Sequence, residues 1–126
     1  ITLANGATVR RLDVQVEAVP MYNLTEDRMQ FHAKGRGNGY IVTMGGTRIY
    51  ISGDTEDIPE MRALENIDVA FVCFNLPYTM TEGQAADAVN AFSPGVVFPY
   101  HYQGSDLALF TGLVDNSIEV RNGDWY

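Results

Sequence analysis

Two segments of this chain end in residues whose side chains bind metal ions in proteins. The apolar run 49–51 leads into Gly53 and Asp54, and the apolar run 96–100 ends at His101. A carboxylate and an imidazole at the ends of buried strands are suited to hold a divalent metal ion. A zinc site needs at least three protein ligands, and the only other histidine is His32. The pattern therefore predicts a metal site that includes Asp54 and His101, with His32 as either a third ligand or an exposed loop residue.

Composition limits the classes of protein to which the chain can belong. Its 126 residues are 46% hydrophobic, which is enough for the core of one domain. The formal net charge of -8 and the scattered basic residues disfavour nucleic acid as a partner. No apolar run approaches the roughly 18 residues of a membrane span, so we expect a soluble protein, and the sequence leaves its compartment, cytoplasmic or periplasmic, open. The single cysteine, Cys73, lies in an apolar run and is expected to be a buried hydrophobe; a catalytic thiol is the weaker alternative.

The spacing of apolar residues predicts strands and helices in alternation. Strands are expected at 13–19, ending at Pro20, and then at 40–44, 47–51, 69–74, 96–100 and 118–120. Gly45 and Gly46 predict a tight hairpin, and the polar segment 23–36 predicts a loop.

Three helices are expected between the later strands. The first covers 58–66, the second follows a capping box at Thr81 and Gln84, and the third is capped by Ser105 with Leu109, Phe110, Leu113 and Val114 on one face. The acidic residues Glu56, Asp57 and Glu60 are expected to favour the positive end of the first helix.

An early hairpin followed by alternating strands and helices predicts an α/β fold with a mixed sheet and helices packed on one face. In such sheets ligands bind at the carboxyl ends of the strands, where Asp54 and His101 fall. Asn75 and Tyr78 follow the intervening strand, and Tyr102 follows His101. We expect Asn75, Tyr78 and Tyr102 to line the substrate pocket.

The order of these motifs resembles the C-terminal half of a metallo-β-lactamase-fold metal-dependent hydrolase. The resemblance rests on Gly53-Asp54-Thr55, on 58–61, on the loop 78–80, on the helix at 84–88 and on the strand that ends at 99–102. It implies half of an αββα sandwich, with residues 1–126 as the C-terminal half of the domain. It also implies that Asp54 bridges two metal ions and that His101 binds the second. Those ions would be zinc, with manganese or iron as alternatives, and would activate water to hydrolyse an ester, amide or phosphodiester in a small-molecule substrate.

The chain departs from this family in its ligands. The family's principal signature, His-x-His-x-Asp-His, is absent, and Tyr22 and Asn23 stand where another ligand histidine is expected. His32 is the candidate replacement. We therefore expect the isolated chain to be inactive and to pair with the N-terminal half of the same domain or with a second copy. The alternative is a non-catalytic binding or assembly module that has the same half-fold and no functional metal site.

Overall fold

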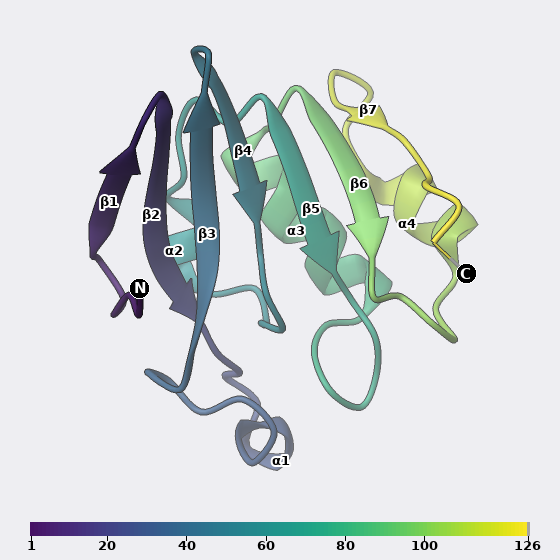
Figure 1. Ribbon diagram of the computed structural model, residues 1–126. Coiled ribbons are helices and arrows are strands. Elements are labelled where there is room, and N and C mark those ends of the chain that lie inside the picture. The colour runs from purple at the N-terminus through teal and green to yellow at the C-terminus, as the bar shows by residue number, and fades with distance from the viewer. Residues whose placement is uncertain (126) are drawn as a thin grey trace.

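The strands of the sheet follow one another in chain order from one edge to the other (Figure 1). The computed structural model describes residues 1–125. The strands are β1 (Thr8–Arg11), β2 (Val14–Met21), β3 (Gly37–Met44), β4 (Thr47–Ile51), β5 (Val69–Cys73), β6 (Val96–Tyr100) and β7 (Glu119–Val120). The strands β1 to β4 pair antiparallel, and β4 to β7 pair parallel. The predicted mixed α/β sheet is therefore confirmed.

The antiparallel part of the sheet is built around a tight hairpin. Gly45 and Gly46 join β3 to β4 and have φ angles of 57° and 84°, the left-handed values that a two-residue hairpin turn needs and that glycine adopts without steric cost. From β4 onward the strands all run in the same direction, because each later connection contains a helix that returns the chain to the same end of the sheet.

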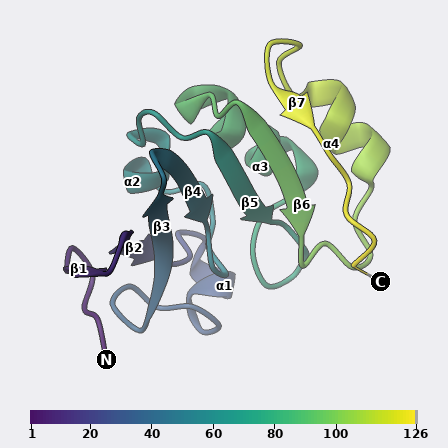
Figure 2. The same cartoon turned by 45° about the horizontal axis from the view of Figure 1, so that its top comes forward.

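Three helices lie on the same face of the sheet in both views: α2 (Pro59–Arg62), α3 (Glu82–Phe92) and α4 (Leu107–Leu113) (Figures 1 and 2). The predicted capping box begins α3, because the Thr81 hydroxyl accepts from the Gln84 N–H and the Gln84 side chain accepts from the Thr81 N–H. The core lies between this layer and the sheet, and includes Tyr50, Phe74 and Phe110, each at most 1% exposed. The fourth helix, α1 (Glu26–Met29), lies beyond the end of β2 and contributes no buried residue.

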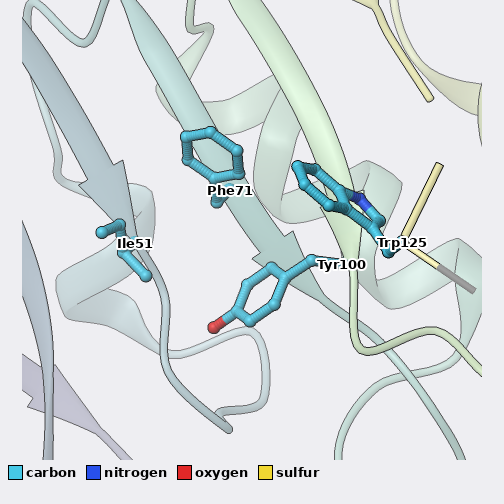
Figure 3. Close-up of a pocket in the computed structure, with 4 residues that line it drawn as sticks. All are labelled: Ile51, Phe71, Tyr100 and Trp125. Carbon is cyan, nitrogen blue, oxygen red and sulfur yellow. The ribbon is translucent and has the colours of Figure 1, made fainter. Parts of the chain in front are cut away.

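The opposite face of the sheet is apolar and carries no helix. Paired positions across five neighbouring strands form one partly exposed row of branched aliphatic side chains, Val16, Val42, Ile49, Val69 and Val96. On this face a pocket of about 380 Å³ is lined by Ile51 of β4, Phe71 of β5, Tyr100 of β6 and Trp125 (Figure 3). The Trp125 indole N–H donates to the Pro99 carbonyl at 2.8 Å, which holds the ring near β6. Burial raises the pKa of Tyr100 to about 12.

Several predicted boundaries were wrong. Pro20 does not end β2 but pairs with Asn38, and it is tolerated because β1 pairs only as far as Glu17, so β2 has one neighbour at that point. The helix expected over 58–66 covers only Pro59–Arg62.

The last helix also begins and packs differently from the prediction. Its N-cap is Asp106, whose carboxylate accepts from the Leu109 N–H, whereas the Ser105 hydroxyl donates to the Phe74 carbonyl. Leu109 and Leu113 are 49% and 46% exposed, so the side of α4 that packs on the core carries Leu107, Phe110 and, at the C-cap, Val114.

Burial of Cys73 agrees with the sequence prediction. The thiol is fully buried, and burial raises its pKa to about 11, which leaves it protonated near neutral pH. Within residues 1–125, no helix combines the length and the apolar character needed to cross a membrane.

Candidate functional site

The carboxyl ends of β4, β5 and β6 meet at one edge of the sheet, on the side where the loop containing α1 lies (Figure 1). Asp54 follows β4, His101 follows β6, and His32 comes from the loop between α1 and β3. These three side chains, with Phe31 and Tyr78, line a pocket of about 310 Å³. The fold thus brings together three residues that are far apart in the sequence.

The Asp54 carboxylate lies between the two imidazoles, with one oxygen facing each. His101 Nδ1 is 2.8 Å from Asp54 Oδ1, a hydrogen-bond distance, and His32 Nε2 is 3.4 Å from Asp54 Oδ2. The side chains of His32, Asp54 and His101 are 20%, 34% and 42% exposed, so the group is accessible from solvent. The expected approach of Asp54 and His101 across the sheet edge is observed.

Unusual backbone conformations hold both ends of this pair. Gly53 has φ of 65°, and a Cβ atom there would lie 2.9 Å from both the Asn38 carbonyl oxygen and the Met21 sulfur, so no other residue fits without displacing its neighbours. His101 has φ of 49°, a left-handed value that is uncommon outside glycine. Backbone strain of this kind gathers at functional sites, where the surrounding structure enforces it.

Glu56 holds the loop on the other side of the pocket in place. Its side chain is 2% exposed and accepts hydrogen bonds from the Leu24 and Thr25 N–H groups, from the Thr25 hydroxyl and from Arg28 Nη1. Burial opposes ionisation, but these hydrogen bonds outweigh it and lower the pKa of Glu56 below its ordinary value. Arg28 Nη1 also donates to the Thr79 carbonyl and the Gln84 side chain, and so connects the α1 loop to α3.

The expectation that three acidic residues would favour the start of one helix holds only for Glu60, in the first turn of α2. Glu56 was placed wrongly, because its partners lie at the start of α1 rather than α2. Asp57 pairs with Arg62 at 2.5 Å. Glu60 also accepts from the Tyr22 hydroxyl and from Lys34, both at 2.8 Å.

The three residues expected to line the substrate pocket lie in different environments. Tyr78 lines the pocket, is 45% exposed, and meets the ring of Phe31 edge to face with centroids 5.1 Å apart. Asn75 is buried, and its side-chain oxygen accepts from the Thr79 hydroxyl. Tyr102 packs beside the core, with its ring centroid 6.4 Å from that of Phe74. Asn75 and Tyr102 therefore do not line this pocket.

The donor chemistry of the group suits a metal ion, but the set is incomplete. Two atoms that bind one tetrahedral zinc ion at about 2.0 Å lie about 3.3 Å apart, and the 3.4 Å between His32 Nε2 and Asp54 Oδ2 fits that spacing. His101 is instead hydrogen-bonded directly to the other carboxylate oxygen. Among the described side chains, no group of three or more His, Cys, Asp and Glu residues is arranged so that it could hold a metal ion.

Sequence comparison shows the family to which the chain belongs. The family model of the beta-lactamase superfamily domain matches residues 2–101. Curated metal-dependent hydrolases from Pyrococcus furiosus and Thermococcus onnurineus are 33% and 30% identical, over 86% and 85% of this chain. The match covers 51% of each of these proteins, so the chain spans about half the length of the curated relatives it matches.

Solved structures show the same fold. A proposed metal-dependent hydrolase from Parabacteroides distasonis superposes with a TM-score of 0.94 at 45% identity, covering 98% of this chain and 57% of that one. A metallo hydrolase from Ignicoccus hospitalis superposes with a TM-score of 0.75 at 25% identity, again covering 98% of this chain and 57% of that one. A metallo-β-lactamase fold protein from Bacillus subtilis superposes with a TM-score of 0.75 at 11% identity, covering 98% of this chain and 52% of that one, which shows a likeness of fold alone. The resemblance inferred from the motifs is thus confirmed, and the chain belongs to the beta-lactamase superfamily domain family.

Proposed function

We propose that this chain is the C-terminal part of a metal-dependent hydrolase and that Asp54, His101 and His32 are its contribution to a dinuclear metal site. The observation that carries the proposal is the Asp54 carboxylate between two imidazoles, with Oδ1 facing His101 and Oδ2 facing His32. A carboxylate with one oxygen toward each of two nitrogen donors is suited to bridge two ions. Zinc fits the donor types, with manganese or iron as alternatives.

Each residue has a role in this arrangement. Asp54 would hold both ions through its carboxylate, and His101 and His32 would each bind one of them. When bound, such ions activate water as a nucleophile and polarise a carbonyl or phosphoryl oxygen of the substrate. Tyr78 and Phe31 form the apolar wall beside the group and exclude water from that side of a small-molecule substrate. The substrate class we propose is an ester, an amide or a phosphodiester.

The missing ligands would come from the other half of the same domain. The chain spans about half the length of its relatives, and its helix-free sheet face is apolar across five strands. A face of several hundred Å² would, at about 25 cal/mol per Å², favour association by many kcal/mol. We propose that an N-terminal half covers this face and supplies the remaining ligands. Sedimentation of residues 1–126 alone tests this: we expect association or dye binding, and a monomer that binds no hydrophobic dye would contradict it.

Metal content tests the site directly. The intact protein, with any segments that naturally flank these residues, is loaded with Zn²⁺ or Mn²⁺ and the metal per chain is measured. We expect about two ions for the wild type, loss of both in Asp54→Asn, and loss of one in His101→Gln or His32→Gln. Asp13→Asn is the control, because Asp13 is exposed at the turn between β1 and β2. Equal metal content in Asp54→Asn and the control would refute the site.

A second candidate function is a non-catalytic binding or assembly module. The observation that favours it is the direct hydrogen bond between His101 Nδ1 and Asp54 Oδ1, which pairs these two atoms without a metal ion. Hydrolysis of nitrophenyl ester, anilide and phosphodiester substrates by the metal-loaded protein separates the two. Activity on any one class, lost in Asp54→Asn, supports the hydrolase. Absence of both metal binding and turnover of any of them supports the module.

A further inference from the structure

The side chain of Asn23 connects the two loops that surround His32. Asn23 is 3% exposed, and its Nδ2 donates to the Tyr78 carbonyl at 2.7 Å and to the Arg28 carbonyl at 2.8 Å. Its backbone N–H donates to the carbonyl of His32 itself at 2.8 Å. One buried residue thus fixes the loop that carries His32 at two points and ties it to the loop after β5.

Packing does not explain an asparagine at this position. The Asn23 Oδ1 atom is buried and has no hydrogen-bond partner among the described residues, which is unfavourable and which an apolar side chain would avoid. Turning the amide over would not help, because its oxygen would then face the two carbonyl oxygens that its nitrogen now contacts. The benefit of Asn23 therefore lies in its two N–H donors.

Those donors determine which nitrogen of His32 carries the proton. His32 Nδ1 lies 3.2 Å from the Tyr78 carbonyl oxygen and 3.3 Å from Asn23 Nδ2. Both amide hydrogens of Asn23 already point to carbonyl oxygens at shorter distances, so Asn23 has none left for Nδ1. Nδ1 must then be the N–H that donates to Tyr78. When the imidazole is neutral, this Nδ1–H is its one N–H and the lone pair lies on Nε2, the atom 3.4 Å from Asp54 Oδ2.

We infer that Asn23 is a positioning residue that holds His32 in its Nδ1–H tautomer, with the Nε2 lone pair facing Asp54. It acts by fixing the Tyr78 carbonyl as the acceptor for Nδ1–H. A histidine ligand is commonly oriented in this way by a hydrogen bond from its other nitrogen to a backbone carbonyl. The value of this tautomer for metal binding rests on the function proposed above, but the tautomer itself does not.

Nitrogen NMR of the intact, metal-free protein measures the tautomer. The chain has two histidines, so two imidazole patterns are expected from these residues, and His101→Gln assigns them. At about pH 8.5, where an ordinary imidazole is neutral, we expect His32 to show protonated Nδ1 and unprotonated Nε2. Protonated Nε2 in the folded wild type would overturn the inference.

Two variants test the part played by Asn23. In Asn23→Ser, and in Asn23→Leu should the first not fold, we expect His32 to shift toward the Nε2–H form that free histidine favours. The matched control is Asn90→Ser, which removes a similar bridge, between the Leu113 carbonyl and the Asp115 N–H, and should leave His32 unchanged. A folded Asn23 variant with the wild-type tautomer would refute the role of Asn23.

Metal titration then separates this inference from the proposed function. If both hold, Asn23→Ser weakens metal affinity by about 10- to 100-fold with unchanged stoichiometry, as loss of an outer hydrogen bond does. If the wild type binds no metal and the tautomer still depends on Asn23, the positioning role stands and the proposed function fails. If metal binds and neither the tautomer nor the affinity responds to Asn23, the positioning role fails alone.

Discussion

Replacing the buried Glu56 with glutamine should destabilise the protein far more than the same replacement of an exposed glutamate. The carboxylate accepts four hydrogen bonds, with Oε2 accepting from two backbone N–H groups and Oε1 from the Thr25 hydroxyl and Arg28. In Glu56→Gln one oxygen becomes an NH₂ group. That group must face either the two backbone donors or the guanidinium, and the positive charge of Arg28, 19% exposed, loses its counter-charge in either case.

The magnitude follows from that burial. Removing one partner of a buried ion pair costs about 3–5 kcal/mol, and the partial exposure of Arg28 favours the lower end, about 3 kcal/mol. For a cooperative unit of 126 residues this corresponds to a fall in Tm of about 11 °C, and for a longer unit the fall is proportionally smaller. It is also a large fraction of a typical stability of about 5–15 kcal/mol.

Thermal and urea unfolding of the intact protein, followed by circular dichroism, measure the effect. The matched control is Glu119→Gln, which breaks an exposed pair with Arg121 and should leave Tm unchanged. The double variant Glu56→Gln/Arg28→Met should be less destabilised than the sum of its single variants, because no charge is left unpaired. The reasoning fails if Glu56→Gln and Glu119→Gln shift Tm equally, or if the double variant is simply additive.

Three further outcomes follow from the same structure. Folding lowers the pKa of Glu56, so the stability that its carboxylate contributes is full above the unfolded-state pKa of about 4.3 and is lost as the pH falls through the folded-state pKa. The difference in free energy of unfolding between wild type and Glu56→Gln, measured by urea unfolding, should therefore shrink below about pH 4. Phe110→Ala should cost about 3–5 kcal/mol in the same assay, against less than about 1 kcal/mol for the half-exposed Leu109→Ala. Gly39→Ala should lower Tm, because the added Cβ would lie 2.7 Å from a backbone oxygen just after β4. Gly83→Ala in α3 should raise stability by about 0.5 kcal/mol, because the added Cβ would have no atom closer than 3.9 Å. Equal effects of the two glycine variants would contradict this.

Local sequence patterns were enough to predict the central strands. The bounds of β4 and β6 were predicted to the residue, because each is a short apolar run closed by a turn or by a polar residue. Strand β1 was missed, because its residues, Thr8–Arg11, are mostly exposed and show no apolar face. It pairs with β2 through backbone hydrogen bonds that the side-chain pattern does not reveal. Ser105 was chosen as a cap on residue type alone, and its neighbour Asp106 fills that place.

The site residues that follow strands could be placed from the sequence, whereas the site residue that lies in a loop could be named only as a candidate. Asp54 and His101 follow parallel strands, and parallel strand ends share one edge, so their approach could be expected. The sequence left His32 open between a third ligand and an exposed loop residue, because its position depends on contacts from Asn23 and Tyr78, 9 and 46 residues away in the chain. Glu56 was misplaced for the same reason, since its partners lie about 30 residues earlier in the chain.

Different interactions consequently hold the two histidines in place. His101 follows a strand whose inner side chains are part of the hydrophobic core, so its position should persist as long as the sheet does. The loop before His32 contains α1, which buries no side chain, so polar contacts through Glu56, Arg28 and Asn23 must hold it. Local opening has a lower free-energy cost where few apolar contacts must be broken. Hydrogen exchange in the α1 loop should therefore rise in Glu56→Gln before the strands lose protection, and His32 should separate from Asp54 while His101 remains in place.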